Sequence, residues 1–447
     1  MASNSIFNSE SDEDTWIINI NNMLTDTDLN VLNNIPVCVY HVPKSLSCVK
    51  PEAFIPQLIA IGPYNHFVPE LYPMERFKIY SAKRVLSHFD NLELKQLVER
   101  LGKLGPYIRA SYHKYIDLKN ETLLYIMAID GLFLLDFLQN YLQQESSSSF
   151  FGGLQQLAVT CGVKLTKDAI VKDVIMLENQ MPTRMMRKIL KVESSKPKDS
   201  VDEELGSMLL AFCKKHSPVV LCQSPSCSEA VKRHHLLDLM YHLIVSQDDI
   251  MGPPPFEVQG TDQNPEYETD SRKRSKSGKP RTLIALVLTK LRAPLDWTLN
   301  CLEKLKDMEF SMMKPIKKPI EGILRVCNHD MGSESVSDER ELPAVMVIPS
   351  VSELHEAGIR FRAATGGITT IEFDEKLGIF YLPVVKVDVN SEVIMRNLVA
   401  YEALTNSESL IFTRYTELMR GIIDSVEDVE LLVKMGVIVN RLGPRGL

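Results

Sequence analysis

The sequence predicts a mainly α-helical protein with a small antiparallel β-sheet, an α+β fold in which a large helical body precedes a C-terminal β-lobe and helices. Apolar residues recur at helical spacing in the first part of the chain, most densely in TLLYIMAIDGLFLLDFLQNYL at 122–142. Beyond residue 320 the pattern changes to short extended segments, GGITTIEFD and IFYLPVVKVD, joined by a turn at Asp374–Gly378. A chain of 447 residues is long enough to hold both parts.

The expected organisation begins with an acidic, polar and disordered N-terminus, after which a helix starts at Trp16. A low-complexity insertion interrupts the helical body, and we expect it to be disordered. Its basic run, RKRSKSGKPR at 272–281, could be a nuclear localisation signal, but such runs are more often solvated linkers, and we interpret it as a linker. The predicted segments are the N-terminus (1–15), the helical body (16–245), the insertion (246–281), helices continuing the body (282–320), the β-lobe (321–390) and the C-terminal helices (391–447).

Charge and cysteine content argue against several classes of protein. The net charge is −8 and the pI is about 5.8, whereas a protein that binds nucleic acid presents a basic face. The eight cysteines are scattered and form no compact disulfide framework, which favours reduced thiols. We find neither a signal peptide nor an apolar run of about 18 residues, so we expect no transmembrane span and a cytoplasmic location.

The stretch Asp168–Leu190, DAIVKDVIMLENQMPTRMMRKIL, combines acids and amides with a helical apolar pattern. Its apolar positions from Ile170 to Met181 would share one helical face. Pro182 disfavours the α conformation at Met181, so we expect the helix to break there and restart. The side chains of Glu178–Gln180 then lie at the break. We favour the interpretation that they satisfy exposed backbone groups, and a functional cluster is the alternative.

Asp130 lies inside the apolar run YIMAIDGLFLL, where an unpaired carboxylate would be costly. Lys78, Arg109 and Arg187, on other predicted helices, are its candidate partners. A structural ion pair is the favoured interpretation, and a catalytic acid or metal ligand is the alternative.

Two constellations could carry chemistry. Four acids from four helical segments could converge on one cavity and bind a phosphate-bearing ligand through a divalent ion; these candidate catalytic residues are Glu75, Asp130, Asp173 and Glu178. A zinc site is a weaker candidate because the spacing departs from the usual pairs; its residues would be Cys213, His216, Cys222, Cys227 and His234 or His235. Because we find no G-x-S-x-G elbow and no phosphate-binding loop, we assign no catalytic residue, no metal and no cofactor.

Nine sequence segments between about Ile35 and Gly443 match a known family in order: IPQLIAIGPYNH, MERFK, IRASY, MAIDGLFLLDFL, DVIMLENQMP, HHLLDLMYHL, SELHEAGIRF, RNLVAYE and DVELLVKMGVIVNRLG. Together they resemble the plant domain-of-unknown-function 247 family, the UPF0481 proteins. The resemblance implies a plant protein without an established reaction, cofactor or catalytic residue. Some members in grasses are implicated in self-incompatibility, as pollen-side recognition components.

The resemblance also concerns the C-terminus. Family members typically continue past the NRLG position with another helical segment and end in a hydrophobic membrane-spanning helix. After the NRLG motif at Asn440–Gly443, this chain ends with Pro444–Leu447. We therefore expect no membrane anchor in this chain, and the plasma membrane is the alternative location if an anchor has been lost from it.

These observations favour a non-enzymatic recognition or interaction protein that binds a protein partner and no nucleic acid. The alternative is an enzyme with an acidic, helix-lined pocket, which could depend on a divalent metal and act on a small plant metabolite. The positions of the four acids distinguish the two functions. Acids that face one cavity favour an enzyme, whereas acids held separately within packed helices favour an interaction protein.

Overall fold

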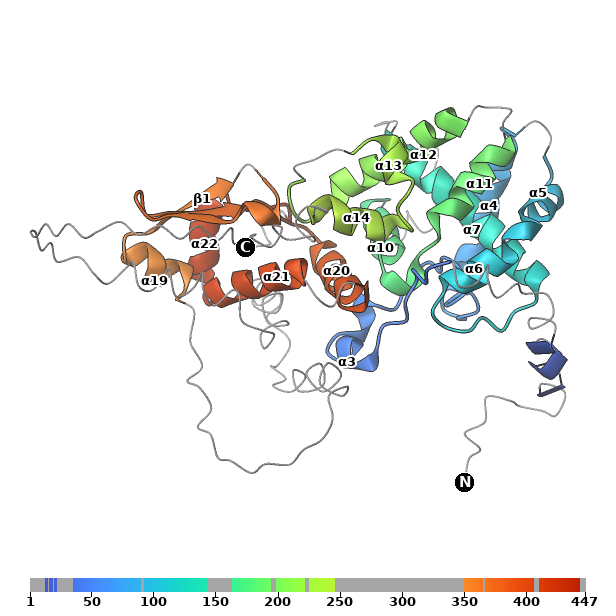
Figure 1. Cartoon of the computed structure of the whole chain (residues 1–447), viewed down its shortest axis with the longest axis horizontal. Helices are drawn as coiled ribbons and strands as arrows, with labels where there is room; N and C mark the ends of the chain where they lie inside the picture. Colours follow the sequence, from blue (N-terminus) through green and yellow to red (C-terminus); the bar gives the residue numbers. More distant parts are fainter. Residues whose placement is uncertain are drawn as a thin grey trace, which may run out of the picture. The chain divides into compact units, whose positions relative to one another are not determined.

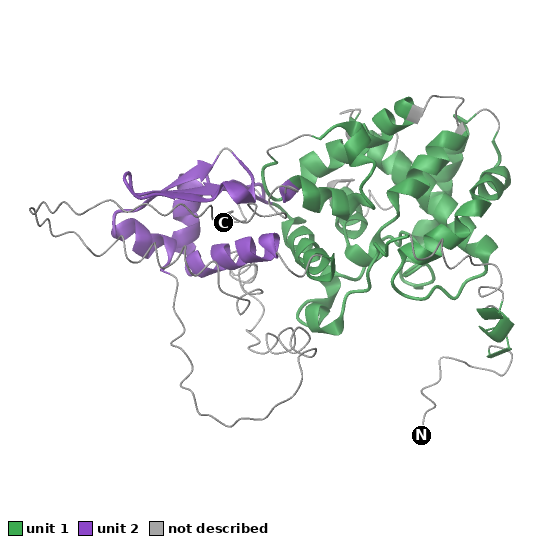
Figure 2. Ribbon diagram, in the orientation of Figure 1, with its two compact units in different colours: residues 1–243, 388–405 green, residues 244–387, 406–447 purple. Residues whose placement is uncertain are grey.

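The computed structural model describes residues 35–89, 92–142, 163–193, 198–221, 225–245, 349–364, 366–405 and 410–442, together with short pieces between residues 13 and 21. The chain forms two compact units, residues 1–243 with 388–405 and residues 244–387 with 406–447 (Figure 2). The predicted insertion (246–281), the helices predicted for 282–320 and the first part of the predicted β-lobe (321–348) lie outside the described residues.

Unit 1 is built from helices and irregular segments (Figure 1). Its described α-helices are α3 (Lys44–Ser47), α4 (Glu75–Leu86), α5 (Leu94–Leu101), α6 (Gly105–Ser111), α7 (Asn120–Leu142), α10 (Val163–Val174), α11 (Thr183–Glu193), α12 (Lys198–His216), α13 (Cys227–Ala230), α14 (Leu236–Ile244) and α20 (Ser391–Thr405). Four short 3-10 helices accompany them: η1 (Pro51–Ala53), η2 (Tyr72–Met74), η3 (Gly102–Leu104) and η4 (Leu177–Asn179).

Helix α7 is the central helix of unit 1 and packs against α4, α5, α6, α11 and α12. Because its side chains are apolar on all faces, it must be surrounded by other elements, and the prediction of a buried central helix is confirmed. Leu123, Met127 and Phe133 have no exposed surface. Burial of each such side chain stabilises the fold by about 1.5–3 kcal/mol.

A glycine in the middle of α7 allows α11 to approach closely. A Cβ atom at Gly131 would lie 2.4 Å from Cδ1 of Ile189 and 3.3 Å from Sδ of Met181. Glycine inside a helix costs about 1 kcal/mol relative to alanine. The close packing between α7 and α11 offsets this cost, which accounts for the Asp-Gly pair inside an apolar helix.

The helix break before Pro182 comes earlier than the sequence predicts. Helix α10 ends at Val174, η4 follows, and α11 begins at Thr183, so the predicted helical face does not extend to Met181. The physical reason is that Nε2 of Gln180 donates to the carbonyl oxygens of Val174 and Met176, at 2.7 and 2.8 Å. These bonds satisfy the end of α10 in place of a further helical turn. The interpretation that polar side chains satisfy the broken backbone is confirmed for Gln180 and for Asn179, whose Nδ2 donates to the carbonyl of Asp173 at 3.0 Å. It is not confirmed for Glu178, which binds Val42 and His41.

Unit 2 combines short strands with three described α-helices and a 3-10 helix. The helices are α19 (Val351–Glu356), η5 (Ile368–Thr370), α21 (Ile411–Ile422) and α22 (Val426–Lys434), and the strands are β1 (Arg360–Ala364), β2 (Glu372–Asp374), β3 (Ile379–Pro383), β4 (Val385–Val387) and β5 (Ile438–Asn440). The predicted fold class, mainly α with a small β-sheet, is confirmed. Of the described residues, no helix is both long and apolar enough to cross a membrane.

The strands of unit 2 form a three-stranded sheet of order β1-β3-β2 and a two-stranded sheet of β4 and β5. Strands β2 and β3 pair antiparallel across the predicted turn, where Gly378 adopts a φ of 62°. Strand β1 pairs parallel with β3, and β4 pairs parallel with β5. The three-stranded sheet is therefore mixed and the two-stranded sheet is parallel, so the predicted antiparallel pairing is correct only for β2 and β3. The alternating pattern identifies strands and their local turn, but it does not give the direction of a partner further along the chain.

Asp428 joins two helices of unit 2. Its Oδ1 accepts hydrogen bonds from the amide and hydroxyl of Ser352, at 2.7 and 2.5 Å, and its Oδ2 accepts from the amides of Asp424 and Ser425, at 2.9 and 2.8 Å. Burial alone would raise the pKa of Asp428, but these donors outweigh burial and lower it to about 2. One carboxylate thus caps the start of α22 and holds α19 against it.

Candidate functional site

The segment Gln57–Gly62 passes through the interior of unit 1 in neither helix nor strand, and residues 59–61 are at most 1% exposed. Its buried N–H groups therefore need acceptors that a sheet would otherwise supply. Asp173, at the end of α10, accepts from the amides of Gln57 at 3.1 Å, Leu58 at 2.6 Å and Ile59 at 2.8 Å. Burial raises the pKa of Asp173 despite these three amide donors.

Two further side chains hold the rest of this segment. Asn179 accepts from the amide of Ile61 through Oδ1 at 2.7 Å and donates to the carbonyl of Ile59 through Nδ2 at 2.9 Å. Asp130 accepts from the amide of Gly62 through Oδ2 at 2.9 Å. Gly62 has a φ of 75°, and a Cβ atom there would lie 2.6 Å from the hydroxyl of Tyr112, so the position requires glycine. Side chains from α7, α10 and η4 together replace the missing ladder of backbone bonds.

Asp130 also forms the centre of a buried charge cluster, which we define as Lys78, Asp130, Glu75 and His66. The ammonium group of Lys78 lies 2.7 Å from Oδ1 of Asp130 and 2.5 Å from Oε1 of Glu75, and the side chains of Lys78 and Asp130 have no exposed surface. Burial alone would lower the pKa of Lys78, but the two carboxylates outweigh burial and raise it. Burial raises the pKa of Asp130, and Lys78 opposes that rise. The lysine is therefore the cation that balances this cluster.

His66 completes the cluster from the loop before α4. Its Nδ1 lies 3.8 Å from Oε1 of Glu75, and burial lowers the pKa of His66. One ligand atom each from His66, Glu75 and Asp130 lies within 4.8 Å of the others, a spacing that could hold a metal ion. The ammonium group of Lys78 already contacts both carboxylates, so an incoming ion would have to compete with it.

Glu178 lies apart from this cluster. Its Oε1 accepts from the amide of Val42 at 2.9 Å, and its Oε2 lies 3.1 Å from Nδ1 of His41. The structure therefore brings two of the four predicted site acids, Glu75 and Asp130, together on Lys78. Asp173 and Glu178 each bind a different segment of backbone.

Three residues of the predicted zinc site, Cys213, Cys227 and His235, lie beside other groups. Sγ of Cys213 lies 3.9 Å from the carbonyl oxygen of Leu236, and Cys227 lies beside Ser207 with 3.4 Å between Sγ and Oγ. Nε2 of His235 lies 2.8 Å from the carbonyl oxygen of Cys38. Cys222 lies outside the described residues.

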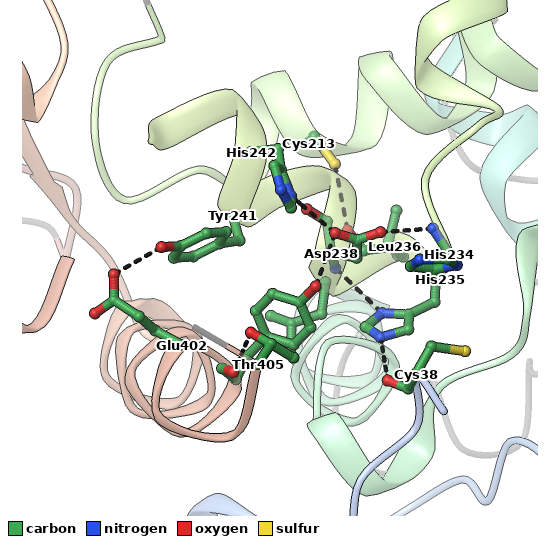
Figure 3. A network of polar contacts seen from close by, with 12 residues as sticks. Cys38, Cys213, His234, His235, Leu236, Asp238, Tyr241, His242, Glu402 and Thr405 are labelled. Carbon is green, nitrogen blue, oxygen red and sulfur yellow. Dashed lines mark hydrogen bonds and ion pairs between the residues drawn. The ribbon is translucent and has the colours of Figure 1, made fainter. Parts of the chain in front are cut away.

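A second polar network, which the sequence reasoning missed, joins α14 to α20 (Figure 3). Oδ1 of Asp238 accepts from the hydroxyl of Tyr401 at 2.8 Å and lies 2.8 Å from Nδ1 of His242. The hydroxyl of Tyr241 donates to Oε1 of Glu402 at 2.7 Å, and Glu402 has no exposed surface. The i, i+4 spacing of Asp238 and His242 in HHLLDLMYHL could have indicated that these two side chains contact each other. No local feature of the sequence pointed to the partners that α20 supplies.

His235 adopts a defined neutral form within this network. Its Nε2 faces the carbonyl oxygen of Cys38, so Nε2 carries the proton, and its Nδ1 accepts from the amide of Asp238 at 3.1 Å. A second proton on Nδ1 would break that bond. Burial lowers the pKa of His235 to about 4, although the charge of Asp238 opposes this shift. Burial alone would raise the pKa of Asp238, but His242 and His235 outweigh it and hold that pKa well below its usual range.

We expect His235 to contribute a loss of stability as the pH decreases from about 6.5 to about 4. In this window the unfolded chain protonates His235 while the folded chain does not, so unfolding takes up a proton and each pH unit costs about 1.4 kcal/mol. His66, whose pKa is also lowered, contributes with the same sign. Urea denaturation at several pH values measures this dependence. His235→Gln should reduce the change in the free energy of unfolding per pH unit by the contribution of one proton. The exposed His113→Gln should leave this pH dependence unchanged.

The geometry defines a class of protein: a helical body whose buried acids and amides serve as acceptors for an irregular internal segment, joined in sequence to a small mixed-sheet unit. The chain belongs to the plant family DUF247, described as plant proteins of unknown function, whose profile matches residues 39–446. A UPF0481 protein of Arabidopsis thaliana, At3g02645, is 34% identical over 453 residues, covering 96% of this chain and 80% of that protein.

A second relative is more distant. The UPF0481 protein At3g47200 of Arabidopsis thaliana is 25% identical over 240 residues, covering 50% of this chain and 45% of that protein. No solved structure matches the chain significantly. The predicted resemblance to the family is confirmed, and the family carries no established biochemical activity in its description.

Proposed function

We propose that this chain is a non-enzymatic recognition protein that binds a protein partner. The proposal is supported by the groups that the buried acids bind. Asp173 accepts three backbone amides, Asp130 accepts the amide of Gly62 and contacts Lys78, and Glu178 accepts the amide of Val42. Acids committed in this way fix the path of the chain, and a buried polar network of this kind specifies one packing arrangement. Pollen-side recognition, which the family resemblance implies for some members, is a role of this type.

A metal-dependent enzyme is the second candidate function, and one observation favours it. His66, Glu75 and Asp130 offer ligand atoms within 4.8 Å of one another, as a divalent ion would require. Lys78 weighs against it, because its ammonium group contacts the same two carboxylates. The two functions therefore differ in whether a divalent ion replaces the lysine.

We expect millimolar Mg²⁺ or Mn²⁺ not to raise the melting temperature of the protein. An ion that bound the folded state alone would stabilise it by RT ln(1 + [L]/Kd), about 2.7 kcal/mol at a hundredfold excess over Kd. Thermal unfolding followed with increasing ion concentration measures this effect. A dose-dependent rise that Glu75→Gln abolishes would contradict the recognition proposal and support the enzyme.

Native mass spectrometry of the chain purified from plant tissue gives an independent test. We expect a complex whose added mass is that of a second protein. Added mass of a metal ion or of a small molecule, without a protein partner, would favour the enzyme instead.

A further inference from the structure

The outward face of α4 carries apolar and basic side chains together. At about 100° per residue, Arg76, Ile79, Tyr80 and Lys83 fall within an arc of about 100° around the helix axis, and Tyr72 precedes them in η2. Tyr72, Ile79 and Tyr80 are 61%, 56% and 51% exposed. We call these five residues the α4 stripe. The opposite face of the helix, which includes Lys78, Ser81 and Ala82, is buried.

The stripe has unmatched charge as well as exposed apolar surface. Arg76 and Lys83 are both exposed, and neither makes an ion pair with another described residue. Three large apolar side chains in one group on a helix surface mark an interaction site more often than scattered single ones do. A complementary occupant would carry acidic groups beside apolar side chains.

The N-terminal segment of the same chain has this composition. It reads ESDEDTWII at residues 10–18, with four acids followed by a tryptophan and two isoleucines. Glu13 and Asp14 are exposed, and Trp16, Ile17 and Ile18 are 38%, 49% and 59% exposed. The described residues between 13 and 21 have helical backbone. At 100° per residue Glu13, Trp16, Ile17 and Ile20 fall on one face, the i, i+3, i+4, i+7 spacing with which helices dock on apolar surfaces.

We propose that the acidic N-terminal segment, residues 10–20, docks on the α4 stripe of its own chain. Its Trp16–Ile20 side chains cover the apolar residues of the stripe, and its acids face Arg76 and Lys83. The tether is long enough, because the 15 residues from Asn21 to Ile35 can span up to about 50 Å, whereas a body of unit 1's size has a radius of gyration of about 18 Å. This contact goes beyond the proposed function and does not depend on it.

Tryptophan fluorescence of the full chain tests the contact. The chain has two tryptophans, Trp16 and Trp297, so Trp297→Phe leaves Trp16 as the reporter. We expect its emission to be blue-shifted, and its quenching by acrylamide at least twofold weaker, relative to a synthetic peptide of residues 9–21. In that background, Arg76→Glu with Lys83→Glu should shift the emission to the red and restore the quenching. The matched control is Lys188→Glu with Lys214→Glu, two exposed lysines on other helices, and should change neither.

Exchanging the charges between the N-terminal segment and the α4 stripe should restore the contact. Adding Glu13→Lys and Asp14→Lys to the Arg76→Glu, Lys83→Glu variant should restore the blue shift, and circular dichroism should be unchanged throughout because all four residues are exposed. Emission of Trp16 equal to that of the peptide, or an equal change in the control variant, would overturn the proposal. A blue shift that disappears on dilution would place the segment on a second copy and would also overturn the contact within one chain.

Discussion

Lys78→Met should destabilise the protein by about 3–5 kcal/mol, as expected when one partner of a buried ion pair is removed. The variant retains a side chain of similar length but leaves Asp130 and Glu75 without the ammonium group that contacts both. Asp130 has no exposed surface, so its charge would lie uncompensated in the interior. Urea denaturation at pH 7 measures the loss. Lys188→Met, at an exposed position of α11, should change stability by less than about 0.5 kcal/mol.

The pH dependence of this loss separates electrostatics from packing. Without Lys78, the pKa of Asp130 in the folded variant rises further, so the folded state binds a proton that the unfolded state does not. Stability of the variant relative to the wild type should therefore recover as the pH falls toward the usual pKa of aspartate. A loss that stays constant from pH 7 to pH 5 would mean that packing, not charge, sets its size.

A double-mutant cycle gives the coupling between the two residues. Asp130→Asn keeps an oxygen for the amide of Gly62 and removes the charge, so adding it to Lys78→Met should recover part of the lost stability. Asp130→Ala alone should cost about 3 kcal/mol. In that variant Lys78 still contacts Glu75, but Gly62 loses its acceptor and α7 gains a cavity.

The sequence predicted that Asp130 pairs with a cation, because a buried carboxylate without one would be costly, but it did not predict which cation. Lys78 was one of three candidates, and the other two bind elsewhere: Arg109 donates to the carbonyls of Ile116 and Leu118, and Arg187 pairs with Asp202. Choosing among the three requires the packing of α4 against α7, which periodicity does not give. Helix faces and the presence of a buried central helix follow from local pattern, whereas pairings between helices follow from the fold.

The roles of Asp173 and Glu178 could not be predicted in this way. Each binds backbone amides, and every residue except proline offers such a donor, so no residue type marks the partner in the sequence. The partner of Asp173 is more than 110 positions away, in Gln57–Ile59. The hydrogen bond from the hydroxyl of Tyr401 to Asp238 joins two side chains, but they lie 163 positions apart, so no local pattern connects them. Side-chain identity tells which groups need partners, and only the fold tells which segments supply them.

Asp173→Ala should destabilise the protein by about 2–6 kcal/mol, because it strands the amides of Leu58 and Ile59 and each unsatisfied buried group costs about 1–3 kcal/mol. The third amide belongs to Gln57, an exposed residue, and can bind water instead. Glu178→Ala, which removes the acceptor of a single amide at Val42, should cost about 1–3 kcal/mol on the same basis. Urea denaturation of both variants gives the comparison. Asp199→Ala, at an exposed position of α12, is the control and should change stability by less than about 0.5 kcal/mol.

Hydrogen exchange shows where the loss from Asp173→Ala arises. If Asp173 holds the internal segment, the amides of residues 57–59 should exchange faster in the variant by a larger factor than the amides of α7, because the segment opens before the body unfolds. Asp173→Asn, which keeps one acceptor oxygen but places an amide group against the donors, should lie between the wild type and Asp173→Ala. Equal acceleration in the segment and in α7 would mean that Asp173 supports the whole helical body and does not hold this segment selectively.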